Sequence, residues 1–371
     1  MAGTFLHIIA FNVPYPADYG GIIDIYYKIK ALREAGVQVI LHCYTYGRQS
    51  SKELEELCFR VYYYPRKKGV KYQFSNIPYI VTTRNANTMP GNLLGDAFPV
   101  LFEGLHTTGP LLRCREAGKK ILVRMHNVEH DYYRALARSE RNYADRLFFL
   151  LESLKLKRYE KVLKHADHIL GISGADTAYF ESTYGKATCI HAFQRFEEID
   201  VPEGKGEYVL FHGNLGVAEN EGILLKFALP VLSRLPHRVI VAGKQPTRKL
   251  HLLLGRHSHI ELIPDPSDQE MEDLISRAQV HLVLTRQSTG IKLKLLHALY
   301  RGRHCLVNPP MVEGTALGKL CTVVGSRTEL EQQIERLMLI PVPSGETDRR
   351  KKALKEYSNR AGAEKILRLI S

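Results

Sequence analysis

The chain has 371 residues, of which 44% are apolar, and its 52 Lys and Arg outnumber its 39 Asp and Glu to give a formal charge of +13. At roughly 100–200 residues per domain, this length predicts two domains with a core each and excludes a single small module. An ordinary apolar share and a charged share of 25% also exclude a disordered or fibrous chain. The positive charge favours polyanionic partners such as phosphate groups, anionic lipid or nucleic acid.

The chain shows no sign of export or membrane insertion. It lacks the run of ~18 apolar residues that a membrane span needs, and no basic leader with a cleavage site precedes the first strand. Six scattered cysteines form no CxxC pair, which predicts reduced thiols rather than disulfides. We therefore expect a cytoplasmic protein.

Short apolar runs alternate with amphipathic stretches, which predicts an α/β protein with parallel sheets. Most runs of the first half are continuously apolar, as expected for strands covered on both faces. Predicted strands there are 5–11, 37–44, 99–103, 120–125, 168–172 and 187–193. Long helices with a basic side are predicted over 131–165 and 348–369. Each basic side is expected to be solvated surface, with attachment to an anionic membrane as the alternative.

A polar stretch at 194–207 separates this half from a second one, in which the pattern restarts. Predicted strands are 208–212, 237–242, 259–263, 280–285, 304–307 and 321–324, with helices near 219–235, near 268–278 and from about 291. We predict two doubly wound domains at 1–195 and 208–345, a linker at 196–207, and a C-terminal helix at 346–371 that can pack back on the first domain. The default ligand site is the cleft at the carboxyl ends of the strands.

The first chemical motif is a loop that follows the first strand and ends in Gly20 and Gly21. Glycines at a strand-to-helix turn let backbone N–H groups approach an anion or a sugar, with the positive helix end behind them. The spacing is not GxGxxG, so a dinucleotide fingerprint is not indicated. A plain tight turn is the alternative.

The second motif is His126-Asn127-Val128-Glu129-His130, directly after a strand. It matches HxxEH, the inverted zinc-peptidase pattern, but two histidines at a strand-to-helix corner do not share a helix face. We expect His126 to project from the strand end as a hydrogen-bond partner or a general acid or base. A capped helix start at Asn127 is compatible with this role.

The third motif is the loop and helix start at 285–299. The N–H groups of Gly290 and Ile291 are predicted to point at a bound group, and Lys292 places a cation where a helix normally prefers carboxylates, which favours a bound phosphate. As a lone histidine, His297 is more often a packed residue than a ligand contact. Gly213-Asn214 and Gly243-Lys244 follow two strands of this half, where a nucleotide would lie.

Together these segments resemble the family 4 (group 1) glycosyltransferases of GT-B architecture, over nearly the whole chain and most specifically at 126–140 and 288–302. The resemblance implies two Rossmann-like domains that face a cleft. It also implies transfer of a sugar from a nucleotide-diphosphate donor to a glycan or lipid-linked acceptor with retention of configuration, without a metal or cofactor. It places the protein in bacterial surface polysaccharide or glycolipid synthesis. Separately, the basic segments outside the motifs favour contact with an anionic membrane that carries the acceptor, at the inner face of the cell membrane.

The resemblance also assigns roles to residues. Asp18, Gly20 and Gly21 match the loop near the acceptor and the donor phosphate, and His126 matches the histidine that touches the donor sugar. Donor-binding positions are Gly213, Asn214, Lys244, Ile263, Thr289, Gly290, Ile291, Lys292 and His297. His126 and Lys292 are the residues expected to act in catalysis.

Two departures from the family pattern bear on activity. Two glutamates eight positions apart are usual, and Thr289 and His297 occupy those positions. A neutral histidine can hydrogen-bond a ribose hydroxyl but lacks the charge and second oxygen of a carboxylate. The usual Arg-Lys pair aligns near Asn220-Glu221, so Lys292, Lys244 and Arg248 have to neutralise the diphosphate. A member that binds sugar nucleotide without transfer is therefore the alternative, whereas nucleic-acid binding lacks any supporting motif.

Overall fold

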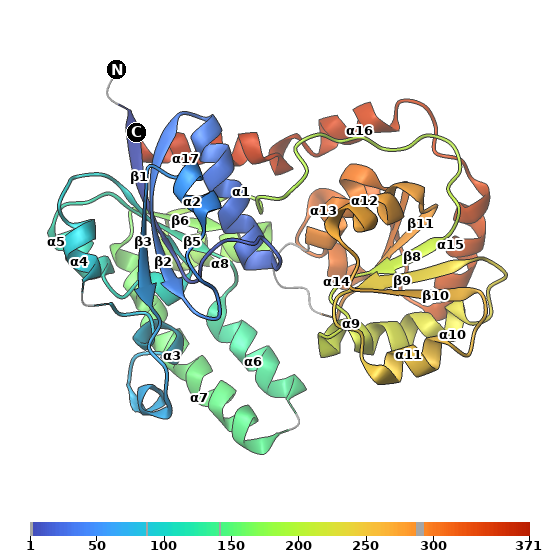
Figure 1. Cartoon of the computed structure of the whole chain (residues 1–371), viewed down its shortest axis with the longest axis horizontal. Coiled ribbons are helices and arrows are strands. Elements are labelled where there is room, and N and C mark those ends of the chain that lie inside the picture. Colours follow the sequence, from blue (N-terminus) through green and yellow to red (C-terminus); the bar gives the residue numbers. More distant parts are fainter. Residues whose placement is uncertain (1–2, 87, 141, 287–292) are drawn as a thin grey trace. The chain divides into compact units, whose positions relative to one another are not determined.

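The computed structural model describes residues 3–86, 88–140, 142–286 and 293–371, which form two compact units with one parallel sheet each (Figure 1). The N-terminal unit contains residues up to Arg195 together with Glu356–Ser371, and the C-terminal unit contains the described residues from Phe196 to Lys355. None of the helices in the described part of the chain combines the length and the hydropathy needed to span a bilayer.

The N-terminal sheet has seven strands in the order β3-β2-β1-β4-β5-β6-β7. Its strands are β1 (Thr4–Ala10), β2 (Val37–Thr45), β3 (Arg60–Pro65), β4 (Val100–Glu103), β5 (Ile121–Met125), β6 (His168–Gly171) and β7 (Ala187–Cys189). Every pair is parallel, and chain order reverses between β1 and β4. In doubly wound sheets this switch point is where ligands bind.

Helices cover both faces of this sheet because its strands are apolar on both sides. On one face α1 (Gly20–Glu34) and α17 (Asn359–Ile370) share a core cluster with β1 and β2. Gly362 of α17 lies so close to the ring of Phe193 that a Cβ there would be 2.7 Å from Cζ. The remaining helical segments are α2 (Lys52–Leu57), η1 (Val70–Phe74), α3 (Tyr79–Thr82), α4 (Met89–Leu93), η2 (Leu105–Thr107), α5 (Leu111–Glu116), α6 (Glu129–Ser139), α7 (Tyr143–Tyr159), η3 (Glu160–His165), α8 (Gly174–Tyr184) and η6 (Lys355–Tyr357).

The C-terminal sheet has six parallel strands in the order β10-β9-β8-β11-β12-β13. They are β8 (Val209–His212), β9 (Val239–Gly243), β10 (Ile260–Pro264), β11 (Val280–Val283), β12 (His304–Val307) and β13 (Thr322–Val323). The switch point lies between β8 and β11. Its helical segments are α9 (Ala218–Ile223), η4 (Leu224–Ala228), α10 (Leu229–Leu232), α11 (Arg248–Leu254), α12 (Asp268–Arg277), α13 (Leu293–Arg301), α14 (Pro309–Val312), η5 (Ala316–Leu320), α15 (Arg327–Leu339) and α16 (Glu346–Ala353).

The predicted α/β class with two doubly wound sheets is confirmed, and three element predictions need correction. Strand β3 was not predicted, because its Tyr-rich edge sequence is half exposed rather than continuously apolar. The predicted helix over 131–165 is two helices, since the Asn142 side chain accepts hydrogen bonds from the backbone of Ala144 and Asp145 and caps α7. The predicted helix over 348–369 is likewise divided into α16, η6 and α17.

Candidate functional site

The central strands of the N-terminal sheet end in polar side chains. Asn12 lies two residues past β1, Glu103 is the last residue of β4, and His126 follows β5. Carboxyl ends of parallel strands meet at one edge of a sheet. There Glu103 and His126 form a hydrogen bond, whereas the Asn12 amide donates to the Tyr46 carbonyl at 3.2 Å.

His126 is held in place by Glu103. Its Nε2 lies 3.0 Å from Glu103 Oε2, its ring packs edge-on against Phe11 at 5.7 Å between centroids, and its side chain is 11% exposed. The carboxylate accepts a hydrogen bond, so Nε2 carries the hydrogen in a neutral ring and Nδ1 remains an acceptor. The predicted position of His126 at a strand end is therefore observed, with a partner that fixes its orientation.

Glu103 belongs to a buried ion-pair network. Lys28 Nζ donates to Glu103 at 2.6 Å and to Asp24 at 2.9 Å, and Arg124 donates to Asp24 at 2.9 Å. The four side chains are at most 1% exposed. Two carboxylates and two cations balance, which is the condition for burying charge in a low-dielectric core.

The pKa values of the two carboxyls follow from this balance. Burial by itself raises the pKa of Asp24, but the charges of Arg124 and Lys28 outweigh it and hold the pKa well below its usual range. Burial by itself also raises the pKa of Glu103. The charge of Lys28 and the hydrogen bond from His126 outweigh burial, so the pKa of Glu103 is lower than its usual value. Both groups are therefore carboxylates at neutral pH.

Asp24, Glu103 and His126 also have the chemistry of metal ligands, with ligand atoms within 4.8 Å of one another. The ammonium of Lys28 donates to both carboxylates and so takes the place a cation would occupy. The HxxEH pattern does not assemble a second ligand set. His126 bonds to Glu103, whereas His130 Nδ1 lies 3.1 Å from Glu160 Oε2, and Glu129 Oε1 lies 4.0 Å from His106 Nδ1.

A second buried polar group adjoins His126 and contains Arg84, His106 and Glu129. Glu129 Oε1 is 4.0 Å from His106 Nδ1, and Arg84 donates to the carbonyl of Phe11 at 2.8 Å. Burial raises the pKa of Glu129 to about 8 and lowers that of Arg84 to about 10. Burial also lowers the pKa of His106 well below its usual range, so this histidine is neutral.

The glycine loop lies at the start of α1. No side chain caps this helix, and a Cβ on Gly20 would have no atom within 4 Å. A Cβ on Gly21 would come within 2.8 Å of Phe11 Cζ, so Gly21 is needed for packing. Asp18 forms an ion pair with Arg48, which also donates to the Pro16 carbonyl at 2.5 Å. The open side of Gly20 and the uncapped N–H groups suit an anion or a sugar hydroxyl.

The corresponding edge of the C-terminal sheet is shaped by close backbone approach. A Cβ on Gly243, at the end of β9, would be 1.7 Å from the carbonyl oxygen of Gly213, which follows β8. Gly213 has φ +154. The Asn214 side chain accepts a hydrogen bond from the N–H of Gly216 at 3.0 Å and so shapes the loop. Glycine is required at Gly243 because two strand ends touch there.

Two strained residues follow β9 and β10. Gln245 and Asp265 have φ of 53° and 47°, in the left-handed region, and the Gln245 N–H donates to Asp265 Oδ1 at 2.8 Å. Such backbone costs about 1–3 kcal/mol per residue and concentrates at functional sites. Lys244 is exposed beside Gln245, and Ile263 is half-buried in β10.

Cations also lie at this edge. Lys294 of α13 donates to the Leu284 carbonyl at 2.6 Å and to Asn220 Oδ1 at 3.2 Å. Arg286 is exposed after β11, and its guanidinium lies beside Gly222. Sequence analysis did not single out these two residues, although both lie within or next to the predicted loop and helix start. They supply positive charge where Asn220 and Glu221 replace the expected Arg-Lys pair.

Four predicted donor residues, Thr289, Gly290, Ile291 and Lys292, lie outside the described residues. His297 is half-buried, and its ring packs edge-on against Phe196 at 5.1 Å between centroids. Burial, with His297 and Lys294 nearby, lowers the pKa of His212 to about 3. The C-terminal unit therefore carries neutral histidine at the end of β8, in contrast to the ionised network of the N-terminal unit.

Comparison with solved structures decides the architecture. The chain matches a glycosyltransferase from Rickettsia africae with a TM-score of 0.64 and 12% identity, over 100% of this chain and 98% of that one. It matches the trehalose-6-phosphate synthase OtsA with a TM-score of 0.64 and 11% identity, over 98% of each chain. The chain has the GT-B fold.

A further GT-B match is the Anabaena protein HepE in complex with UDP and glucose, with a TM-score of 0.63 and 11% identity over 98% of each chain. Among curated sequences, an uncharacterized 44.6 kDa protein in the cps region of Klebsiella pneumoniae is 27% identical over 316 residues, 79% of each chain. No family model matches the sequence.

Sequence analysis missed the residues of the buried ion-pair network because they lie far apart in the chain. Asp24, Lys28, Glu103 and Arg124 are separated by up to 100 positions, and only the fold brings them together. A weak signal exists, since Arg124 interrupts the apolar run of β5 and Lys28 interrupts an apolar face of α1. A charged residue at a core-facing position implies a buried partner.

Proposed function

We propose that this chain is a glycosyltransferase that moves a hexose from a nucleotide-diphosphate sugar to a glycan or lipid-linked acceptor, with retention of configuration. The observation that carries the proposal is the GT-B pair of sheets, with an oriented His126 at the switch point of the N-terminal one. The cps-region relative supports a role in bacterial surface polysaccharide synthesis. The proposed reaction needs no metal or other cofactor.

The C-terminal unit is proposed to bind the donor nucleotide. Lys244 is exposed beside the strained turn after β9, and Lys294 and Arg286 add positive charge at the switch point. Cations near a diphosphate stabilise it by charge-assisted hydrogen bonds. Lys292, with the N–H groups of Gly290 and Ile291, is proposed to complete this site.

Transfer is proposed to proceed by front-face displacement. The bond between C1 of the sugar and the phosphate oxygen breaks, and a bond from the acceptor oxygen to C1 forms on the same face. The leaving phosphate takes the acceptor proton, and Lys292 stabilises its growing charge. His126 orients the donor sugar through Nδ1, while the open side of Gly20 leaves room for the acceptor.

A donor screen tests the proposal. Purified protein is incubated with UDP-, GDP-, ADP- and dTDP-sugars and with lipid-linked acceptors, and release of nucleoside diphosphate is measured. We expect release with one donor class and a loss of turnover of about 100-fold in His126→Ala. His168→Ala is the matched control, because His168 is the first residue of β6 and lies at the opposite edge of the sheet.

The alternative is a protein that binds sugar nucleotide without transferring the sugar. It is favoured by His297, which packs against Phe196 where the family pattern has a carboxylate. A thermal-shift screen with nucleoside diphosphates separates the two, because a ligand that binds only the folded state raises Tm. A thermal shift without nucleoside diphosphate release from any donor and acceptor combination would establish the alternative.

A further inference from the structure

Helix α7 exposes an apolar stripe. Tyr143, Leu147, Leu151 and Leu154 are 85%, 57%, 50% and 63% exposed. Their spacing of three to four residues places them on one side of the helix. A helix that packs on a core normally turns its apolar side inward and its polar side to water, so this outward stripe indicates a binding surface.

The same side of the helix becomes basic toward its end. Lys157, Arg158, Lys161 and Lys164, on α7 and η3, are exposed, and none of them forms an ion pair with a described residue. Asp145 is the only exposed acidic residue among the described positions of α7 and η3. The surface is therefore apolar at one end and cationic at the other.

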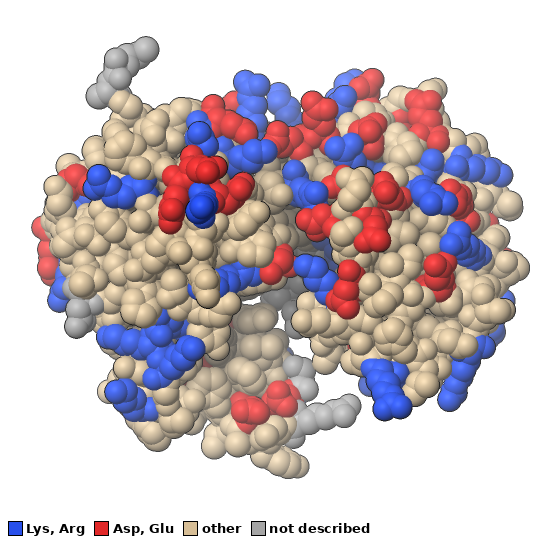
Figure 2. Space-filling view, viewed as in Figure 1, with Lys and Arg blue, Asp and Glu red and all other residues tan. Residues whose placement is uncertain are grey.

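The η1 segment extends this surface. Val70 and Phe74 are 63% and 84% exposed, and the neighbouring Lys68 and Lys71 are exposed as well. The segment is fastened to α7, since Lys155 Nζ donates to the carbonyl of Gln73 at 2.5 Å. Figure 2 shows basic side chains over the η1 region, and over the neighbouring α6–α7 hairpin a mainly uncharged surface with a few acidic side chains.

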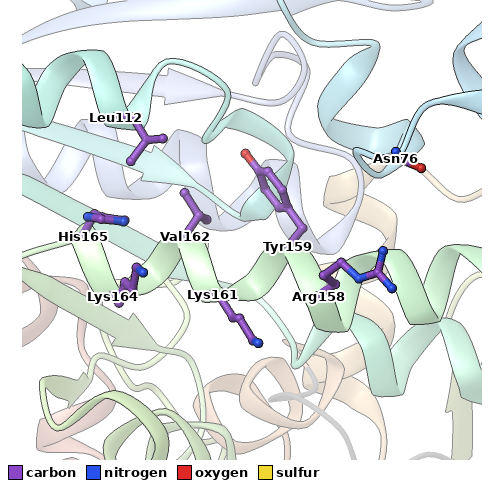
Figure 3. Close-up of a pocket in the computed structure, with 8 residues that line it drawn as sticks. All are labelled: Asn76, Leu112, Arg158, Tyr159, Lys161, Val162, Lys164 and His165. Atoms are coloured by element: carbon purple, nitrogen blue, oxygen red, sulfur yellow. The ribbon is translucent and has the colours of Figure 1, made fainter.

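A shallow hollow of about 320 Å³ lies beside the basic end of α7. In Figure 3 the apolar side chains of Tyr159 and Val162 point toward Leu112 of α5, while the charged ends of Arg158 and Lys161 extend outward. An apolar floor with a cationic rim fits a lipid, whose phosphate meets the rim and whose glycerol and first methylenes meet the floor.

We propose that this α7–η1 surface, formed by the exposed residues of α7, η3 and η1, docks on an anionic lipid bilayer. Exposed apolar side chains enter the interface between headgroups and acyl chains, and the adjoining lysines and arginines meet anionic headgroups. The inference rests on the proposed function only in that a lipid-linked acceptor explains why a bilayer is approached. A second copy of this chain carries the same formal charge of +13, so anionic headgroups are the better electrostatic partner for the basic end.

The other basic run, at 349–352, differs in structure. Arg350 is 3% exposed and donates to Glu346, to the Leu299 carbonyl at 2.9 Å and to the Gly302 carbonyl at 2.7 Å. Arg349 pairs with the same Glu346. Arg350 therefore holds α16 to the turn after α13, whereas Arg349 pairs within α16. Lys351 and Lys352 are exposed, but α16 has no large apolar side chain beside them.

Vesicle binding of the full chain tests the docking surface. Vesicles of phosphatidylcholine with 30% phosphatidylglycerol are compared with pure phosphatidylcholine in a sedimentation assay at several salt concentrations. We expect binding to the anionic vesicles that weakens with salt. The variant Leu147→Ser/Leu151→Ser/Leu154→Ser should bind about tenfold more weakly, and neutralising Lys157 or Lys161 with Gln should weaken binding about fivefold per residue.

A matched control is Leu252→Ser/Leu339→Ser, since these leucines are 63% and 68% exposed in the C-terminal unit. It should bind like the unmodified chain, and unchanged Tm values should show that all variants fold. Equal binding to neutral vesicles, or full binding by the leucine variant, would overturn the proposal. So would a leucine variant that converts a dimer into a monomer without affecting vesicles.

Nucleoside diphosphate release in vesicle-free solution separates this inference from the proposed function. Release without vesicle binding refutes only the docking surface. Vesicle binding without release refutes only the transferase.

Discussion

The two sheets differ in what lies at the carboxyl ends of their central strands. In the N-terminal unit, Asp24, Lys28, Glu103 and Arg124 are fully buried and electrically balanced, and they hold a single histidine. In the C-terminal unit, glycine contacts and strained turns bring the backbone close, and the side chain of Lys244 is exposed.

The difference indicates what each edge is suited to bind. A neutral, rigid edge positions an uncharged group such as a sugar hydroxyl with little reorganisation. An edge with an exposed lysine and close backbone approach suits a phosphate. This division matches the proposed roles, with the sugar contacted by His126 and the diphosphate bound by the C-terminal unit.

Removing the ammonium of Lys28 should destabilise the buried network of the N-terminal unit. Lys28→Met leaves Asp24 and Glu103 buried with only Arg124 to balance them, so we expect the free energy of unfolding to fall by about 4 kcal/mol. Urea denaturation measures it. Lys30→Met, at a 43% exposed site on the same helix, should change it by less than ~1 kcal/mol. Similar losses from both would contradict a structural role of the network.

Adding one methyl group at Gly243 should force apart the ends of two strands in the C-terminal unit. Gly243→Ala forces its Cβ against the carbonyl of Gly213, so the strand ends must separate, at a loss of about 3 kcal/mol. Gly318→Ala is the control in the same unit, because its Cβ would meet Val312 at an ordinary 3.6 Å. Equal unfolding midpoints for the two variants would show that the close approach is not required.

The buried acid beside His106 gives the N-terminal unit a pH dependence. Glu129 keeps its proton in the folded state up to a pKa of about 8, whereas the unfolded chain loses it near 4.5. The folded state binds more protons between these values, so stability conferred by this group is lost as pH rises through that range. Arg84 favours ionisation, while Glu160 and Asp176 oppose it, and His106 faces it uncharged.

Glu129→Gln removes this titration. Relative to the variant, the unmodified chain should lose about 2 kcal/mol of unfolding free energy between pH 5.5 and 7. Denaturation at both pH values measures the difference, with the exposed Glu116→Gln as control. A variant whose stability keeps the same difference from the unmodified chain at both pH values would refute the elevated pKa.

The smallest effect on stability is expected at Lys244. Because its side chain is exposed, Lys244→Ala should change the free energy of unfolding by less than ~0.5 kcal/mol. It should weaken nucleoside diphosphate binding about tenfold by removing a charge-assisted contact. Lys249→Ala, exposed on α11, should leave the affinity unchanged. Calorimetric titration distinguishes the two, and equal affinities would remove Lys244 from the site.

The sequence by itself determined most strands of both sheets, and it identified the carboxyl ends of these strands as the place of the candidate site. Continuously apolar runs identify strands that are covered on both faces, and motifs that follow such runs identify His126, Gly213 and Lys244 as strand-end residues. Strand β3 was not predicted, because an edge strand is only half buried and its sequence is not continuously apolar. The break between α6 and α7 was not predicted, because the apolar pattern continues across it and only the Asn142 cap marks the start of α7.

Only the tertiary structure decided what holds His126 and where the apolar stripe of α7 points. Lys28 and Glu103 lie 75 positions apart in sequence, and nothing local in either segment identifies the other as its partner. Likewise, leucines at helical spacing predict a helix, whichever side faces the core. Partners and exposure are properties of packing between distant segments, whereas strand and helix patterns are properties of neighbouring residues.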